Sequence, residues 1–428
     1  MQPNLIAGQW RDGAEARPDI NPSDTSDVVG QFASADAAQA RTAVSAAAEA
    51  ADGWAATPGA VRGEILDRAG AELLARSDEL GNLLAREEGK TLPEAVAEVV
   101  RAGQLLKFHG GQAVRNIGEH LESLRPGIEV TVTREPVGVV SVITPWNFPI
   151  AIPAWKIAPA LAYGNTVVLK PADAVPASAW ALADALNRAG LPPGVLNLVM
   201  GRGREIGDVL TGSAEISAVS FTGSVSTGER VLATAAARKA RVQLEMGGKN
   251  PLVVEDDADL DLAVEVALQG SYGSTGQRCT ASSRLVIAGQ VHDEFVSKLW
   301  ARLQAWYVGD ARAAGTDMGP VVDAGQLAQI CTTSLWPRRR APRCAGASNC
   351  GARNPAITSS RRCSSAREHL TRSTGRRSLA QLRRSSGSVT TTRRSRLPMT
   401  PNLASPPVSS PGRSPGRPTS GAGPRRAW

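Results

Sequence analysis

Cysteine is nearly absent from the first 330 residues of this chain, where Cys279 is the only one. A disulfide framework is therefore excluded there, and the fold must rest on apolar packing. No run of about 20 apolar residues is free of charge or proline, which excludes a membrane-spanning helix. The amino terminus also lacks the basic region and apolar core of an export signal. We therefore expect a cytoplasmic enzyme.

Lysine, phenylalanine and tyrosine are absent from residues 331–428, which hold 20 of the 48 basic residues, all Arg, and one acid, Glu368. This segment has too few apolar residues for their burial to offset the entropy lost when a chain becomes ordered. We therefore predict a disordered Arg/Ser-rich tail. One interpretation is a natural arm that binds nucleic-acid phosphates. The other is a reading-frame error in a GC-rich gene, which the use of Arg without Lys among Ser, Pro, Ala and Gly favours.

The net charge of +8 comes from this tail, since the first 330 residues carry 28 basic and 39 acidic residues, a net charge of −11. We therefore expect an acidic soluble body that binds neither nucleic acid nor a membrane. The spacing of the four cysteines in the tail fits no zinc-site pattern, so we expect no metal. They are Cys331, Cys344, Cys350 and Cys363.

Apolar runs alternate with helical patterns from residue 137 onward. The first strand is expected over 137–144, and further strands near 166–170, 195–200, 216–222, 242–245 and 252–254. Helices are expected between them, over 152–161, 178–189 and 204–211 and from about 225, and earlier over 36–56, 61–88 and 91–114. Strands that alternate with helices predict an α/β fold with a parallel sheet, which binds ligands at the carboxyl ends of its strands.

Cys279 lies in the polar, Gly-rich stretch Ser274–Thr280. A lone cysteine is most often a small buried apolar residue. A reactive thiol instead needs partial exposure and electropositive surroundings, which this stretch offers. We therefore interpret Cys279 as a nucleophile.

Two further side chains have the chemistry to assist such a nucleophile. Asn147 lies between prolines in Pro145–Pro149, after a strand, where a rigid amide suits an oxyanion donor; a structural turn is the alternative. Glu245 lies between an apolar strand and a Gly pair, where partial desolvation suits a general base; an ion-paired strand end is the alternative.

Three stretches at strand ends suggest nucleotide binding. Lys170 and Asp173 have the chemistry to hold ribose hydroxyls, although a solvated strand end is the better explanation when this motif is taken alone. The turn Gly201–Gly207 is one residue longer than the usual dinucleotide fingerprint, so its signal is weak. The Ser224 hydroxyl and the amides near Gly223 open a helix, where a pyrophosphate binds well.

Taken in order, these motifs resemble the aldehyde dehydrogenase superfamily over about residues 3–327. They are Pro-Trp-Asn-Phe-Pro, Lys-Pro-Ala-Asp, Phe-Thr-Gly-Ser, Leu-Glu-Met-Gly-Gly-Lys-Asn-Pro and Gly-Gln-Arg-Cys-Thr. The resemblance implies a Rossmann-type NAD-binding domain over 1–246, with an oligomerisation hairpin at 120–136. It also implies an incomplete catalytic domain over 247–330, before the tail at 331–428.

The resemblance implies roles for individual residues. Cys279 matches the nucleophile, Glu245 the general base and Asn147 the oxyanion amide. The cofactor would be NAD or NADP, with a lean to NAD because a carboxylate at Asp173 repels a 2′-phosphate. The positions that match cofactor contacts are Thr144, Trp146, Lys170, Asp173, Gly203, Gly207, Gly223 and Ser224.

Within the family, the motifs are most similar to α-ketoglutarate semialdehyde (2,5-dioxovalerate) dehydrogenases. Arg278 would bind the substrate carboxylate or lower the thiol pKa, or it is a structural arginine. Gly273 stands where succinate semialdehyde dehydrogenases carry Arg, which counts against succinate semialdehyde; betaine aldehyde is another alternative substrate.

The family continues well past Pro320, with a Glu-x-Phe-Gly-Pro motif and a strand that pairs with a neighbouring subunit, and 331–428 contains neither. The homo-oligomer of the family is therefore not assured for this chain. The competing hypotheses are a truncated, inactive pseudoenzyme that at most binds nucleotide, and a chimera whose tail binds nucleic acid.

Overall fold

The computed structural model describes residues 1–115 and 118–333. All of them belong to the first of two structural units, Met1–Leu382. The predicted tail lies outside the described residues, apart from its first three, which end a helix. In the described part, no helix is long and apolar enough to cross a membrane.

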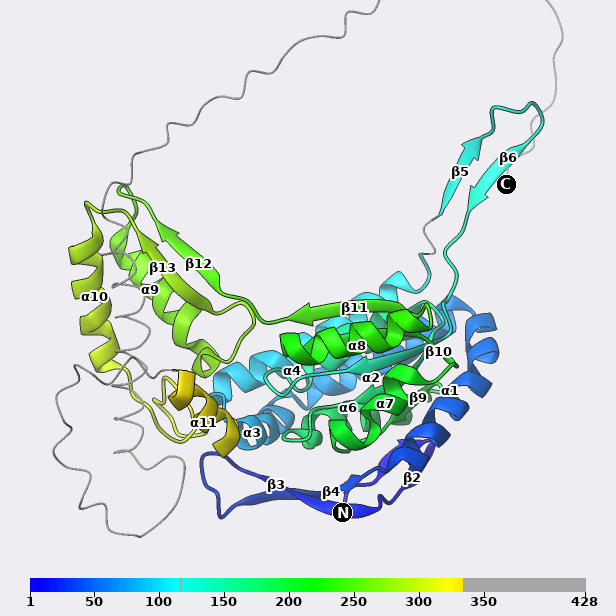
Figure 1. The fold of residues 1–428 in the computed structure, drawn as a ribbon, viewed down its shortest axis with the longest axis horizontal. Coiled ribbons are helices and arrows are strands. Elements are labelled where there is room, and N and C mark those ends of the chain that lie inside the picture. Colours follow the sequence, from blue (N-terminus) through cyan, green and yellow to red (C-terminus); the bar gives the residue numbers. More distant parts are fainter. Residues whose placement is uncertain (116–117, 334–428) are drawn as a thin grey trace, which may run out of the picture. The chain divides into compact units, whose positions relative to one another are not determined.

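The largest sheet has seven strands in the order β11-β10-β7-β8-β9-β1-β2 (Figure 1). Its first five strands are mutually parallel, as the alternating pattern predicts. They are β7 (Val139–Ile143), β8 (Thr166–Lys170), β9 (Leu196–Leu198), β10 (Ile216–Gly223) and β11 (Arg241–Met246).

The amino terminus adds two antiparallel strands that the sequence patterns did not predict. β1 (Asn4–Ile6) pairs with β9 and with β2 (Gln9–Arg11). The turn between them places Ala7 at φ 54° and Gly8 at φ 74°, the left-handed geometry of tight hairpins. The Asn197 side-chain oxygen accepts a 2.9 Å hydrogen bond from the Ala7 N–H. β1 thereby covers an edge of the parallel sheet that would otherwise expose unpaired backbone groups.

Both faces of the parallel sheet are buried, as parallel strands require. Val167 and Leu169 of β8 belong to one hydrophobic cluster, while Val168 between them belongs to another. The first cluster includes α2 (Gly59–Ala75), α3 (Ser77–Glu88), α4 (Leu92–Gln112), α5 (Ala151–Ala162) and α6 (Pro176–Arg188). The second is formed with α1 (Ala37–Ala56), α7 (Gly203–Gly212) and α8 (Val225–Ala237).

Local sequence explains where these helices begin and end. The Asp36 carboxylate accepts a hydrogen bond from the Gln39 N–H and caps α1. Thr91 and Glu94 form a capping box at the start of α4. The single helix expected over 61–88 is divided in two, because Arg76 (φ −106°, ψ 19°) leaves the helical region.

A third hydrophobic cluster is formed entirely by residues after Met246. The parallel strands β12 (Asn250–Val254) and β13 (Ser282–Ile287) pack on α9 (Leu260–Tyr272) and α10 (His292–Ala305). A short 3-10 helix, η1 (Gly273–Gly276), follows α9, and the last helix described is α11 (Ala324–Thr333).

Two antiparallel pairs complete the described part of the chain. β3 (Glu15–Ile20) pairs with β4 (Val28–Ser34), and β5 (Glu119–Glu122) pairs with β6 (Glu129–Val132). The second pair is an antiparallel hairpin that overlaps the region 120–136, and all of its strand residues are exposed.

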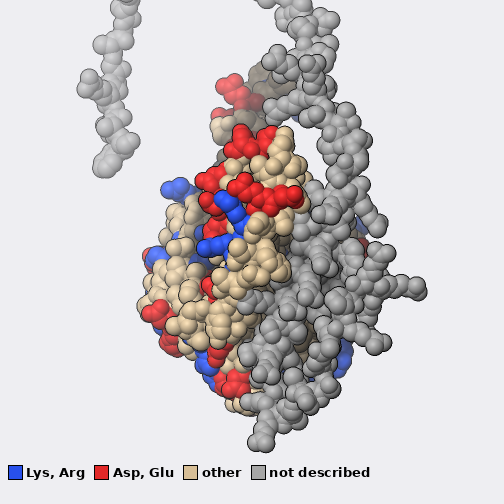
Figure 2. Space-filling view, turned by 90° about the vertical axis from the view of Figure 1, so that its left-hand side faces the viewer, with Lys and Arg blue, Asp and Glu red and all other residues tan. Residues whose placement is uncertain are grey.

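Figure 2 shows acidic side chains grouped on one part of the face turned to the viewer, with some basic side chains beside them. Residues 1–330 carry 28 basic and 39 acidic residues.

Candidate active site

Most of the predicted site residues lie at strand ends of the parallel sheet, whereas Gly207 lies within α7 and Arg278 and Cys279 lie between η1 and β13. Because neighbouring parallel strands point the same way, their carboxyl ends meet at one edge. The residues at or just after these ends are Thr144, Trp146 and Asn147 after β7, Lys170 and Asp173 at β8, Gly203 after β9, Gly223 and Ser224 at β10, and Glu245 at β11.

The structure joins Asn147 to the cysteine loop. The Asn147 side-chain N–H₂ donates a 2.7 Å hydrogen bond to the backbone carbonyl of Gln277, two residues before Cys279. Cys279 is a free, exposed thiol in the turn between η1 and β13. Its carbonyl accepts a 2.6 Å hydrogen bond from the Asn250 side chain at the start of β12. The amide after β7 and the thiol are thus brought to neighbouring loops.

The backbone that leads to this turn adopts an unusual conformation. Ser274 and Thr275 both have positive φ values, 49° and 58°, which side chains with a Cβ rarely adopt. Surrounding contacts hold them there: the Ser274 N–H donates to Glu94 at 2.8 Å, and the Thr275 hydroxyl to the Gly319 carbonyl at 3.2 Å. Such strain persists only where neighbours over-determine it, and it often lies at functional sites.

Glu245 lies on the exposed side of β11. Burial alternates along this strand: Val242 and Leu244 pack toward the second cluster, while Gln243 and Glu245 are exposed. The Glu245 carboxylate accepts a 3.0 Å hydrogen bond from the Gln243 side chain. Within the described residues, it makes no hydrogen bond to the loop of Cys279.

Lys156 on α5 is a residue of this edge that the motif search missed. Its ammonium group donates to Ser220 at 2.8 Å and to Gln243 at 3.1 Å. Burial lowers the pKa of Lys156 to about 8, although the charge of Glu245 opposes the shift. The sequence signal that could have identified Lys156 is that it is the single charged residue in the otherwise apolar sequence of α5.

Lys170, Asp173, Gly203 and Gly207, which the sequence predicts to bind nucleotide, lie at or after the ends of β8 and β9. Lys170, which is buried, donates a 2.7 Å charged hydrogen bond to Asp173. A Cβ on Gly203 would approach the Lys170 side chain to 3.8 Å, whereas one on Gly207 would meet nothing within 4 Å. Open backbone at the start of α7 leaves room for a ligand close to the chain.

The same edge offers polar groups without protein partners. The Thr144 hydroxyl and the Asn147 side-chain oxygen are buried and accept or donate no hydrogen bond within the described residues. Ser224 caps α8, and its hydroxyl accepts from the Thr227 N–H at 3.3 Å. The amino end of α8 therefore suits an anionic group, as a pyrophosphate site requires. Trp146 beside them is half-buried.

Arg278 is engaged elsewhere. Its guanidinium donates to the carbonyls of Gln269 and Gly270 at the end of α9, the second at 3.2 Å. A cation on the last carbonyls of a helix stabilises the helix end. These contacts favour the structural alternative for Arg278 over binding of a substrate carboxylate.

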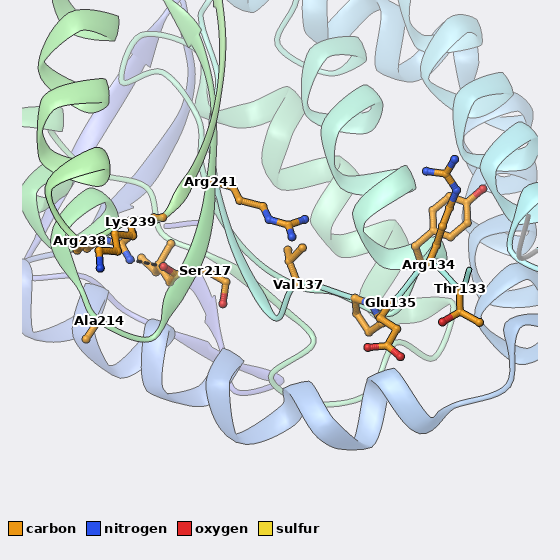
Figure 3. A pocket seen from close by; sticks show the side chains of 13 residues that line it. Thr133, Arg134, Glu135, Val137, Ala214, Ser217, Arg238, Lys239 and Arg241 are labelled. Atoms are coloured by element: carbon orange, nitrogen blue, oxygen red, sulfur yellow. Dashed lines mark hydrogen bonds between the residues drawn. The ribbon is translucent and has the colours of Figure 1, made fainter. Parts of the chain in front are cut away.

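A cavity of about 980 Å³ lies away from this edge (Figure 3). It is lined at the amino ends of β7, β10 and β11, and Figure 3 shows Arg241 reaching toward Val137. None of the predicted site residues lines it. Within the described residues, no group of three or more His, Cys, Asp or Glu is arranged to hold a metal ion.

A parallel α/β sheet with polar and glycine residues at its carboxyl edge, and an exposed thiol on a loop that is hydrogen-bonded to Asn147 there, is typical of one class of dinucleotide-dependent enzymes. Comparison with known proteins narrows this class. Residues 10–334 match the model of the aldehyde dehydrogenase family. The chain belongs to the aldehyde dehydrogenase family.

Two similar proteins are named as dehydrogenases of a keto-acid semialdehyde. A 2,5-dioxopentanoate dehydrogenase of Saccharolobus solfataricus is 45% identical over 325 residues, which cover 75% of this chain and 68% of that protein. An α-ketoglutarate semialdehyde dehydrogenase of Haloferax volcanii is 44% identical over 328 residues, with 76% and 67% covered.

Solved structures have the same fold, and one of the two described here is a complex with NAD⁺. Betaine aldehyde dehydrogenase from Staphylococcus aureus in complex with NAD⁺ superposes with a TM-score of 0.76 at 34% identity, covering 78% of this chain and 67% of that one. An NADP-dependent enzyme from Escherichia coli gives a TM-score of 0.76 at 36% identity, with 78% and 69% covered. The family thus uses NAD or NADP.

Proposed function

We propose that this protein oxidises an aldehyde to a carboxylic acid with NAD or NADP, through a thioester on Cys279. The observation that carries the proposal is the hydrogen bond between the Asn147 amide and Gln277, which holds an amide donor next to the loop of an exposed thiol. Asn147 has a second amide N–H available to an oxyanion.

The chain's own groups account for each step except the acceptance of the hydride. The Cys279 thiolate adds to the aldehyde carbon, and the oxyanion that forms accepts a hydrogen bond from Asn147. The bound nicotinamide ring supplies the hydride acceptor. Loss of the hydride from the carbon leaves a thioester on Cys279. Glu245 takes a proton from water, the water oxygen adds to the thioester, and the acid leaves as the thiolate is regenerated.

The cofactor residues that we propose lie at the edge described above. Lys170 and Asp173 would hold the adenosine ribose, and Ser224 with the amino end of α8 the pyrophosphate. The carboxylate of Asp173 disfavours a 2′-phosphate, which is the reason to prefer NAD. The remaining members of the proposed set are Thr144, Trp146, Gly203, Gly207 and Gly223.

The proposed substrate is α-ketoglutarate semialdehyde, which is oxidised to α-ketoglutarate. Support comes from the names of three relatives between 41% and 45% identical, each a dehydrogenase of this compound. Proteins named for succinate semialdehyde or betaine aldehyde are 35% and 36% identical.

We further propose that the cofactor domain spans 1–246 and that a second, catalytic domain begins at Gly247. The hydrophobic clusters support this division, because the third cluster contains no residue before Leu252. The hairpin within 120–136 is proposed to bind a second subunit, since Leu121, Val130 and Val132 on it are exposed apolar residues.

Nucleotide binding without turnover is a second candidate function. It is favoured by the exposure of Glu245, which makes no contact with the cysteine loop in the described part. It is also favoured by two apolar side chains that are neighbours on β12 and β13 and are largely exposed. Val253 is 56% and Val286 43% exposed. Parallel sheets are normally covered on both faces, so the second domain leaves apolar surface open.

One experiment separates the two candidates. The full chain is mixed with NAD and 2,5-dioxopentanoate, formation of the reduced cofactor is followed by absorbance, and an acyl adduct on Cys279 is sought by intact-protein mass spectrometry. Succinate semialdehyde and betaine aldehyde serve as comparison substrates, and Cys279→Ala as the control. Reduced cofactor and an adduct that the control lacks support the oxidation. Cofactor binding by calorimetry with neither product would establish the second candidate.

A further inference from the structure

Three ionisable side chains are buried together at the junction of α3 and α4. Glu88 is 0%, Lys90 1% and Glu98 5% exposed. The Lys90 ammonium donates to a Glu98 oxygen at 2.6 Å and lies 3.9 Å from a Glu88 oxygen. Apolar residues of similar volume would often serve stability equally well at such a place, so a buried ionic group needs another explanation.

This cluster holds the loop after β7 through its backbone. Lys90 donates a 2.8 Å hydrogen bond to the carbonyl of Asn147, and its ammonium lies 4.1 Å from the centre of the Phe148 ring. The second oxygen of Glu98 accepts hydrogen bonds from the N–H groups of Ile150 and Ala151, each at 3.1 Å. Three backbone groups of one short loop are thus fixed by one ion pair.

The cluster also reaches the cysteine loop, through Gln277. The side-chain amide of Gln277 donates to Glu88 at 3.5 Å, and its oxygen accepts from the Val322 N–H at 3.2 Å. The backbone carbonyl of the same residue is the acceptor for Asn147. Gln277 therefore connects the ion cluster, the amide and the turn of Cys279.

We propose that Lys90 and Glu98 are positioning residues. By binding the backbone of the loop after β7, they hold the Asn147 amide next to the loop of Cys279 without touching the substrate. This inference rests on the proposed roles of Asn147 and Cys279. A donor to an oxyanion accelerates a reaction only when it is fixed before charge develops, and its placement must hold to a fraction of an ångström. A charged pair with three backbone bonds gives that fixation, and apolar side chains do not.

The test removes both members of the ion pair together in the variant Lys90→Met/Glu98→Leu, so that neither partner is left buried without the other. The matched control is Glu87→Leu. Glu87 is equally buried and its carboxylate also accepts from two backbone N–H groups, those of Ala177 and Ser178 at the start of α6. The control therefore loses a comparable set of bonds away from both loops.

Hydrogen exchange at the Gln277 and Ala281 amides is the deciding measurement, because neither amide bonds to Lys90 or Glu98. We expect exchange there to rise about tenfold in the double variant and to stay unchanged in Glu87→Leu, since a lost buried bond loosens what it positions. Where turnover is measurable, kcat falls and the KM for NAD does not. Glu98→Gln, which keeps an oxygen for Ile150 and Ala151, restores part of both effects.

The outcomes are distinct. Exchange at Gln277 and Ala281 that stays at the wild-type level, while that of Ile150 rises, overturns the inference. If the double variant does not fold, Gln277→Ala is tested in its place. It removes the side chain that links the cysteine loop to Glu88 and is expected to raise exchange at Ala281. A wild-type chain without turnover would refute the proposed function alone, because the exchange comparison needs no activity.

Discussion

Stability of this protein is expected to fall as pH rises from 5.5 to 7.5, because buried carboxyl groups keep protons that the unfolded chain releases. Burial raises the pKa of Glu88 to about 8. Burial also raises the pKa of Asp19, and the neighbouring charge of Glu87 adds to the shift. Both Asp19 oxygens are buried without another partner in the described residues, so this pair holds a proton at neutral pH.

The magnitude follows from proton counting. A carboxyl group with a raised folded-state pKa contributes stability that is fully present below its unfolded pKa, near 4, and lost as pH rises through the folded value. Between these limits, one extra proton on Glu88 and one on the Asp19–Glu87 pair give a slope of at most about 3 kcal/mol per pH unit. Water that reaches the buried groups reduces the slope, so we expect at least about 1 kcal/mol per pH unit.

Urea unfolding of the full chain, followed by tryptophan fluorescence, measures this slope. The buffer contains only bulky organic cations, because a small cation between two carboxylates would take the place of the shared proton. Asp19→Asn removes the proton of the pair and is expected to reduce the slope by about half. A free energy of unfolding that is constant or rises from pH 5.5 to 7.5 would refute the argument.

Three further predictions concern the site. Cys279→Ala is expected to abolish turnover and the acyl adduct seen by mass spectrometry, while calorimetry still detects bound cofactor; turnover above background would contradict the role of the thiol. Glu245→Gln should leave the burst of reduced cofactor and slow the hydrolysis of the acyl-enzyme in rapid-mixing experiments, so an unchanged rate of acyl-enzyme decay argues against a general base. Asn147→Ala should lower kcat by about a hundredfold or more, as loss of an oxyanion donor does, whereas an effect on KM alone would indicate a binding role.

The sequence patterns placed the central strands well because each is a short apolar run between turns. β8 was expected at 166–170 and has those bounds. The division of the predicted helix over 61–88 was missed, because Arg76 is a good helix former and only its tertiary position takes it out of the helix. β1 and β2 were not predicted, since their pairing depends on an edge that exists only after the sheet has formed.

The positions of the candidate residues were predictable where a polar side chain follows or ends an apolar strand, as for Asn147 and Lys170. The ion cluster beneath it was not, because Glu88 and Lys90 in sequence look like the solvated face of amphipathic helices. A buried charge leaves no pattern along the chain when all its partners come from other elements. For the same reason, the sequence left the role of Arg278 open until its contacts with α9 were known.

The alternation along β11 has a consequence for how this chain tolerates change. The side chains of a strand point to opposite faces in turn, so the face that Glu245 occupies is decided by whether an even or an odd number of residues precedes it in the strand. An insertion of one residue between Val242 and Leu244 would turn the Glu245 carboxylate into the apolar layer and bring Leu244 to the exposed face. An insertion of two residues restores the original face, so parity rather than length governs which changes this strand accepts.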